Sequence, residues 1–294
     1  MAGRIGGVFD RAQEVRERLQ AGPGAEAATR HADGSTGPVP SRWTLPRLRA
    51  SFPWLTDYSL PGVWKLLRGY GLRLRSGRVQ AYSPDPDYSH KREELLGVLA
   101  QAAAAPRQIE VVFVDEMGYG RWPQAAADWG PVPPARAPLA ERKGHNEQKW
   151  RLIGALNAMS GQVTYLDNYI VGRKQVIKLL KQLDATYPQA ERIYVVLDNW
   201  SIHRHDDVQA ALQALPRIQL VWLPTYAPWL NPIEKLWRWF RQDVWYRHRQ
   251  ADDWDALQQR VHQFFDQFAS GSPELLRYVG LHGDGPLAQA LKMA

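Results

Sequence analysis

Two apolar segments of the sequence end in carboxylates. "VVFVDE" ends at Asp115 and Glu116, and "YVVLDN" carries Asp198 at the same relative place, in a chain of 294 residues. Both segments have the length and the β-branched content of buried strands. Because open α/β sheets place their sites at the carboxyl ends of strands, we expect these acids to approach each other if the strands are neighbours. Carboxylates so placed repel unless a proton or a cation lies between them, and a hard divalent metal ion is the natural occupant.

Asp115 and Glu116 cannot both take part. Successive side chains of a strand point to opposite faces of the sheet, so only one of the two joins the site, and spacing alone does not choose between them. Each acid also has a plain structural interpretation when it is taken singly. Asp198 fits an Asp-Asn turn at the end of a strand, and Asp115 fits a surface acid.

A third acid, Glu234, lies in "LPTYAPWLNPIEKLWRWFR". The first half of this stretch is predicted to be a loop, because its prolines remove backbone donors and fix φ. We expect a helix in the second half, with Asn231 as N-cap and Pro232 at the first helical position, which puts Glu234 in the first turn. The alternative is a purely structural role, in which Glu234 accepts a hydrogen bond from the Asn231 amide in a capping box or pairs with Arg238.

The elements that would position these acids follow from hydrophobic periodicity. We predict strands over 108–116, 192–199 and 217–224, and two strands around a Ser-Gly turn within 149–170. Helices are predicted over 172–187, over 206–215, from 232 through Leu236, Trp237 and Phe240, and from Trp254 to Phe268. Trp222, Trp229 and Trp237 are expected to be partly structural, since most tryptophans of this region should pack the last helices on the sheet. The pattern predicts a mixed α/β core.

The front of the chain has a different character. Residues 1–78 hold 13 Lys and Arg against 6 Asp and Glu, whereas residues 79–294 hold 24 of each, so the whole net charge of +7 lies at the front. Such an asymmetry indicates a polyanion-binding region joined to a near-neutral domain. A solvated basic tail is the simple alternative.

Two short helices are predicted within this basic region. "TLPRLRASF" reads as a helix capped by Thr44, and "SLPGVWKLLRGYG" as a second helix capped by Ser59. On the second helix Val63, Trp64 and Leu67 should face inward and Lys65 and Arg68 outward. Two helices joined by a turn favour a helix-turn-helix that contacts duplex DNA. The candidate DNA-binding residues are Arg47, Arg49, Lys65, Arg68, Arg73, Arg75 and Arg78.

These observations divide the chain into five segments. We expect a flexible basic arm or linker over 1–42, the helix-turn-helix domain over 43–78, a linking helix within 79–108, the α/β domain over 109–270 and a C-terminal tail over 271–294. With no cysteine there is no disulfide framework and no thiolate zinc site. No apolar stretch resembles a secretory signal or a membrane span, so we expect no membrane partner and a cytoplasmic location.

Three of these motifs together resemble a known family. "VVFVDE", "VVLDNWSIHR" and "LVWLPTYAPWLNPIEKLWRWF" are similar to the corresponding motifs of the DDE transposases of the mariner superfamily, in particular the bacterial insertion sequence 630 branch. The 35 residues between Asp198 and Glu234 match the spacing of that family. The resemblance extends over roughly Trp43 to Phe268. Members usually have two helix-turn-helix units, whereas one is readable here.

The resemblance has specific implications. It implies an RNase H-like mixed-sheet catalytic domain behind the DNA-binding domain, with Asp115, Asp198 and Glu234 as the catalytic, metal-binding acids. It also implies two Mg²⁺ ions per site, for which Mn²⁺ can substitute, and Asn199 and His203 are accessory candidates.

The implied reaction is cleavage of transposon ends and joining of their 3′-hydroxyls to target DNA. The implied partners are terminal inverted repeats and target DNA, bound by a homodimer or larger synaptic complex at a bacterial nucleoid. Two alternatives stay open at this point. One is a catalytically silent or domesticated DNA-binding protein derived from a transposase. The other is an RNase H-like nuclease without transposition.

Overall fold

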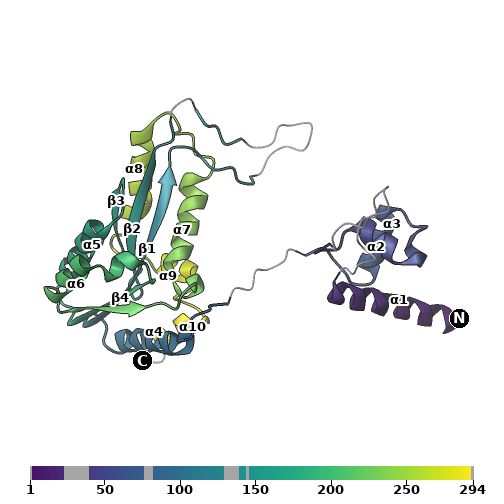
Figure 1. Ribbon diagram of the computed structural model, residues 1–294, viewed down its shortest axis with the longest axis horizontal. Coiled ribbons are helices and arrows are strands. Elements are labelled where there is room, and N and C mark those ends of the chain that lie inside the picture. The colour runs from purple at the N-terminus through teal and green to yellow at the C-terminus, as the bar shows by residue number, and fades with distance from the viewer. Residues whose placement is uncertain (1, 23–39, 76–81, 129–138, 144–145, 293–294) are drawn as a thin grey trace. The chain divides into compact units, whose positions relative to one another are not determined.

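The computed structural model describes residues 2–22, 40–75, 82–128, 139–143 and 146–292, with side chains described from residue 10 onward. The chain divides into two compact units, 1–80 and 81–294 (Figure 1). Among the residues that the structure describes, no helix combines the length and the apolar character needed to cross a membrane.

The first unit contains three helices, α1 (Ala2–Ala21), α2 (Leu45–Ser51) and α3 (Leu60–Gly69), with the turn η2 (Pro53–Leu55) between the last two. Both predicted caps are present, because Thr44 Oγ1 accepts from the Arg47 amide and Ser59 Oγ accepts from the Gly62 amide. The small core of this unit consists of Val15, Leu48, Phe52, Leu55, Val63 and Leu67.

Two expectations for this unit were wrong. The arm predicted over 1–42 contains helix α1, and Val15 of that helix is fully buried against α2 and α3. The apolar residues of α1 are few and widely spaced, so the sequence showed no clear helical periodicity there. Trp64, expected to face inward, is 45% exposed and lies under the Arg68 guanidinium at 4.7 Å from its ring. Aliphatic side chains and Phe52 fill the core between these helices, so the indole of Trp64 lies on the flank of α3.

The second unit is built on a five-stranded sheet of order β3-β2-β1-β4-β5. Its strands are β1 (Ile109–Gly120), β2 (Lys149–Asn157), β3 (Val163–Asn168), β4 (Arg192–Leu197) and β5 (Ile218–Trp222). The first three pair antiparallel, whereas β1, β4 and β5 run parallel. All five correspond to predicted strands. The parallel pairing of β1 with β4 fulfils the condition for bringing Asp115 near Asp198.

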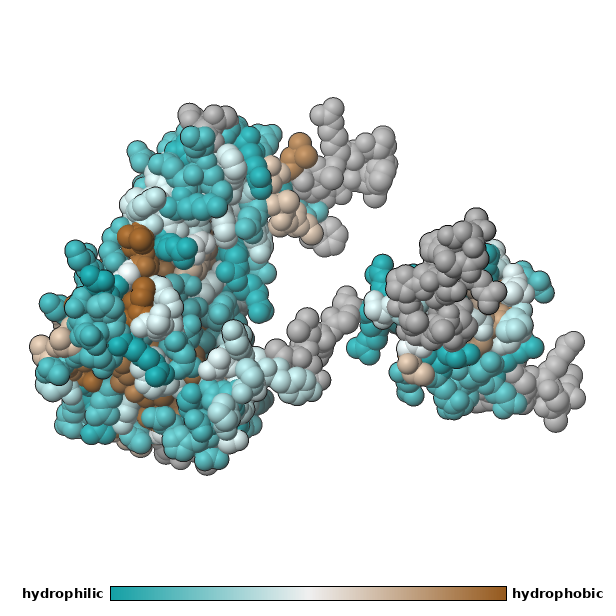
Figure 2. Space-filling view, in the orientation of Figure 1, coloured by the Kyte–Doolittle hydropathy of each residue, from teal (hydrophilic) through white to brown (hydrophobic). Residues whose placement is uncertain are grey.

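Helices cover both faces of this sheet (Figure 1). One face packs against α5 (Arg173–Thr186) and α6 (Asp206–Gln213). The other packs against α4 (Tyr88–Ala104), α7 (Ile233–Phe240), α8 (Trp254–Asp266), α9 (Pro273–Val279) and α10 (Pro286–Lys292). The short turns η3 (Ser201–Arg204), η4 (Pro228–Leu230) and η5 (Arg241–Trp245) complete the second unit. In Figure 2 the surface of this unit is largely hydrophilic, with apolar residues in small separate patches.

The expected outer boundaries of the catalytic unit were too narrow. The linking helix, α4, packs in the main core through Leu95 and Leu99. The segment predicted as a tail forms α9 and α10, whose Leu275 and Leu287 are buried in the same core. Helices of seven residues present too few turns for their periodicity to be recognised.

The start of α7 also differs from the expectation. Asn231 is not a side-chain cap, because the helix begins at Ile233 after Pro232 and no side chain caps it. Asn231 is instead buried, and its Nδ2 donates to the Val114 carbonyl of β1 at 3.4 Å. The Asn231 amide donates to the Pro228 carbonyl at 3.0 Å, so it does not form the capping box with Glu234.

Trp237 holds α7 against the sheet. It is 1% exposed, and its ring packs edge-on to Phe265 of α8. The indole fits because β2 has a glycine beneath it: a Cβ at Gly154 would come within 2.6 Å of Trp237 Cη2. Trp229, in contrast, is 43% exposed, so the expectation of a packing role holds for Trp237 and not for Trp229.

We therefore expect Trp237→Ala to lower the free energy of unfolding by roughly 3 to 5 kcal/mol, the usual effect of removing a large buried aromatic. Trp229→Ala is the matched control on the same loop-helix segment and should change it by less than about 1 kcal/mol. Urea denaturation of both variants measures the difference. Equal stability of the two would contradict the packing described for Trp237.

Candidate active site

The three predicted acids line one pocket. Asp115 comes from β1, Asp198 from the residue after β4 and Glu234 from the first turn of α7, and all three border a cavity of about 560 Å³. Asn199 and Asn231 border it as well. The site lies at the carboxyl ends of the parallel strands, as the strand-end pattern predicted.

Asp115 is the most constrained of the three. Trp237 Nε1 donates to Asp115 Oδ2 at 2.9 Å and fixes its orientation. Burial and then the nearby charge of Glu234 raise the Asp115 pKa to about 7. A bound cation would displace the proton that the Asp115 carboxyl holds in the free protein.

Glu116 points to the opposite face of β1, as alternation requires. Residues 111 and 113 pack with α7 and α8, whereas Val112 and Val114 pack with α5 and α6. Glu116 therefore does not border the pocket of Asp115. It is still close to the site, since Glu116 Oε1 lies 3.7 Å from His203 Nε2, and burial followed by the charge of Asp115 raises its pKa to about 8.

His203 lies between two of these acids. The ring is 2% exposed, and its Nε2 is 3.5 Å from Asp198 Oδ1 as well as facing Glu116. The Trp200 amide donates to the same Asp198 oxygen at 3.0 Å. The histidine and then this amide hold the Asp198 pKa below its usual range, against the effect of burial. His203 thus favours the ionised form of Asp198 without bordering the pocket itself.

Glu234 lies among charges of both signs. Burial raises its pKa, while Arg241 and Arg238 act in the opposite direction. Arg238 and Arg241 follow Glu234 by four and seven residues on α7 and its continuation, so they share its side of the helix. With Lys235 they border a second cavity that also reaches Glu234. These cations were absent from the predicted DNA-binding residues, although the spacing in "EKLWRWFR" contained the signal.

Asn199 stabilises the loop beside the site. Its Nδ2 donates to the Leu223 carbonyl at 2.9 Å and to Thr225 Oγ1 at 3.3 Å, and Arg204 donates to its Oδ1. The side chain therefore joins the end of β4 to the loop after β5. A structural role for Asn199 follows from these bonds.

The donor set suits a hard divalent cation. Three carboxylates supply only oxygen ligands, which Mg²⁺ and Mn²⁺ accept, and the Asn231 Oδ1 is a further buried oxygen with no hydrogen-bond partner in the described part of the chain. Within the described residues no group of three or more His, Cys, Asp or Glu side chains lies close enough together to hold a metal ion. The three acids line the pocket without converging on one point, and Mg²⁺ is the ion that suits such a site, because it binds through few carboxylates together with waters and substrate phosphates.

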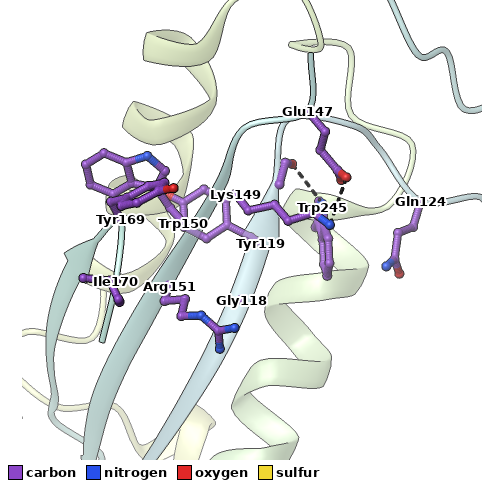
Figure 3. A pocket seen from close by; sticks show the side chains of 11 residues that line it. Gly118, Tyr119, Gln124, Glu147, Lys149, Trp150, Arg151, Tyr169, Ile170 and Trp245 are labelled. Carbon is purple, nitrogen blue, oxygen red and sulfur yellow. Dashed lines mark hydrogen bonds and ion pairs between the residues drawn. The ribbon is translucent and has the colours of Figure 1, made fainter. Parts of the chain in front are cut away.

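A separate pocket lies farther along the sheet (Figure 3). Gly118 and Gly120 of β1 border it, with Lys149 and Arg151 of β2 and the exposed Tyr169 after β3. None of the three predicted acids lines this pocket.

The sequence profile described as "DDE superfamily endonuclease" matches residues 110–258, which is half of the chain and contains all three acids. The chain belongs to this family. Its predicted DDE endonuclease class is thereby confirmed. The predicted RNase H-like mixed-sheet fold is confirmed by the similarity to the solved structures described next. The predicted resemblance to the mariner and insertion sequence 630 transposases is confirmed as well.

Relatives of this DDE endonuclease include the "Insertion element IS630 uncharacterized 39 kDa protein" of Shigella sonnei, which is 27% identical over 235 residues, 79% of this chain and 67% of that protein. Two similar solved structures are the mariner Mos1 paired end complexes with Mn and with Mg. They have TM-scores of 0.56 and 0.56 and are each 17% identical. The matches cover 88% and 95% of this chain and 79% and 84% of those chains. At this identity the likeness concerns the fold.

The predicted DNA-binding residues all belong to the first unit of the chain. Lys65 and Arg68 are exposed on α3, Arg73 and Arg75 are exposed after it, and Arg47 and Arg49 are half-buried on α2. Arg78 lies outside the described residues.

The raised pKa of Asp115 gives a pH-dependent stability. A carboxyl whose folded pKa is about 7, against an ordinary 3.8, contributes stability below about pH 4 that is lost as the pH rises through 7. At about pH 8 without divalent metal, Asp115→Asn should therefore be more stable than the parent. Its unfolding temperature should be higher, and its free energy of unfolding should be larger by at most about 4 kcal/mol. The difference should shrink toward pH 4, as thermal denaturation in chelator would measure. A parent as stable as the variant at pH 8 would contradict this.

Proposed function

We propose that this chain is a DNA transposase that cleaves transposon ends and joins their 3′-hydroxyl ends to target DNA. The observation that supports this best is the meeting of Asp115, Asp198 and Glu234 around one pocket, since they come from three separate elements. The paired end complexes of the Mos1 neighbours agree with a DNA partner and a synaptic assembly of two or more copies.

We propose Asp115, Asp198 and Glu234 as the residues that hold two Mg²⁺ ions, for which Mn²⁺ can substitute. The Mos1 complexes contain these two metals. A bound pair of divalent ions supplies Lewis-acid stabilisation of the attacking and leaving oxygens in an in-line displacement at phosphorus.

The chain's own residues hold the acids in place for this chemistry. Trp237 fixes the Asp115 carboxylate, and His203 with the Trp200 amide fixes Asp198 in its ionised form. Arg238 and Arg241 lie beside Glu234, where they are positioned to bind the phosphates of a DNA strand that crosses the pocket. His203 and Asn199 act in this proposal as positioning residues.

We assign end recognition to the first unit. Helix α3 presents Lys65 and Arg68 away from its core, and exposed arginines follow it. A helix of this kind after a turn can lie in the major groove, with the flanking cations on phosphates. The helix-turn-helix function of α2 and α3 belongs to this proposal.

Replacing any one of the three acids by its neutral amide should lower Mg²⁺-dependent cleavage by at least about 100-fold, because the loss of one metal ligand disrupts both phosphoryl contacts. The assay uses duplex DNA that includes the sequences flanking this reading frame, with Mg²⁺ or Mn²⁺. The folding of each variant is checked by circular dichroism. If Glu234→Gln retained full activity, the glutamate would be structural and the mechanism proposed here would be wrong.

Glu116→Gln is the internal control for this experiment. Its carboxylate lies on the opposite face of β1 and contacts His203, so we expect a loss of less than about tenfold. An inactive Glu116→Gln beside an active Asp115→Asn would mean that the other face of the strand holds the metal. A parent chain that binds DNA but never cleaves it would favour the domesticated DNA-binding protein.

DNA binding by the full chain should weaken steeply with salt. Lys65→Ala and Arg68→Ala should each reduce the slope of log affinity against log salt by about 1, the effect of one lost phosphate contact. Lys174→Ala, an exposed position on α5, serves as the control for a general loss of charge. Fluorescence anisotropy across a salt series measures the slopes. Unchanged slopes in both α3 variants would remove this helix from the DNA interface.

A further inference from the structure

Tyr226 combines two unusual features beside the three acids. Its backbone has φ of +53°, in the left-handed region that bulky side chains rarely adopt. Its side chain is 78% exposed although it borders the same pocket as Asp115, Asp198 and Glu234. A strained residue whose aromatic ring points into solvent at an active site calls for an explanation in function.

The loop around Tyr226 is held from three sides. Ser83 Oγ donates to the Thr225 carbonyl at 2.6 Å, and the Thr225 amide donates to Asp85 Oδ2 at 2.7 Å. Lys91 of α4 pairs with the same aspartate at 2.8 Å. Asn199 bonds the loop from the end of β4. On the other side Ala227 is buried, so the backbone conformation of Tyr226 is imposed by its neighbours.

The surface beside Tyr226 is aromatic and apolar. Trp200, Pro224 and Pro228 line the same pocket as the three acids. The three acids can bind cations, and bound cations can in turn bind a phosphate. Trp200, Pro224 and Pro228, in contrast, offer flat apolar groups and few hydrogen-bond donors. The chemical group that joins a phosphate to a flat apolar ring in DNA is the nucleotide itself.

We propose that Tyr226 stacks on the nucleobase adjacent to the scissile phosphate and thereby positions that strand over Asp115, Asp198 and Glu234. This inference rests on the proposed function of the same pocket. Stacking on an aromatic ring accepts every base, because each has a π-face, so the contact would hold the DNA end without reading its sequence. Because the loop backbone is already fixed, stacking has to order only the Tyr226 side chain, which favours binding.

The test measures stacking directly in the full chain. The probe is a duplex with a short single-stranded end in which 2-aminopurine occupies the unpaired positions, mixed with protein in Ca²⁺, which binds carboxylates and supports little phosphoryl transfer. Stacking should quench the fluorescence of 2-aminopurine. Tyr226→Phe should retain the quenching, whereas Tyr226→Ala and Tyr226→Asn should lose it and bind the probe about tenfold more weakly.

Two controls separate stacking from general damage. Asn is among the residues that tolerate the left-handed conformation, so Tyr226→Asn should be at least as thermally stable as the parent. Tyr169 is similarly exposed, at 72%, but borders the separate pocket of Figure 3, so Tyr169→Ala should keep the parent's quenching and affinity.

Several outcomes would overturn the inference. Quenching unchanged in Tyr226→Ala, or lost equally in Tyr169→Ala, would show that this ring does not stack on the end. A shift from dimer to monomer in Tyr226→Ala without loss of quenching would make the ring a contact to a second copy of the chain. If Asp115→Asn abolishes cleavage while Tyr226→Ala cleaves and quenches as the parent does, the inference fails and the proposed function stands.

Discussion

The catalytic unit is organised around the repulsion between carboxylates that the fold forces together. β1 and β4 are parallel neighbours, so the acids at their ends cannot separate without breaking the sheet. Glu234 adds a third charge from a helix that packs on the same face as Asp115. In the free protein, burial and then this repulsion raise the Asp115 pKa, so protonation of Asp115 relieves part of the repulsion. His203 beside Asp198 and the arginines beside Glu234 stabilise the other two carboxylates. A divalent cation relieves it more fully.

The remaining structure serves to maintain that arrangement. The two faces of β1 are used differently, since Asp115 faces α7 and the pocket while Glu116 faces His203 and a helix pair that lies behind the site. His203 links the two sides through Asp198. The position of one histidine therefore affects the ionisation of an acid that borders the pocket, although the histidine is buried away from it.

Much of this could be predicted from sequence, for identifiable physical reasons. Strands β1, β4 and β5 could be recognised because buried parallel strands are continuous apolar runs. The two caps could be recognised because Thr44 and Ser59 precede helices with proline in the first turn. Helices α1, α9 and α10 were missed, since their buried residues make sense only against partners distant in the chain. Asn231 followed the pattern of a cap but bonds β1 instead, because a tertiary partner competes with the local one.

The residues of the candidate site also fall into those that the sequence reveals and those that only the fold reveals. The acids were found because their chemistry is visible in the residue type, whereas Trp237 and Gly154 were not connected with Asp115. Their relation exists only in three dimensions: the glycine on β2 opposite Asp115 admits the indole, and the indole then reaches the carboxylate. Glu234 and Trp237 lie three residues apart on one side of α7, so the close approach that seats the tryptophan also sets the depth of the glutamate. A shift of α7 would move one acid and release the orientation of another, which makes the packing at Gly154 part of the geometry of the acids.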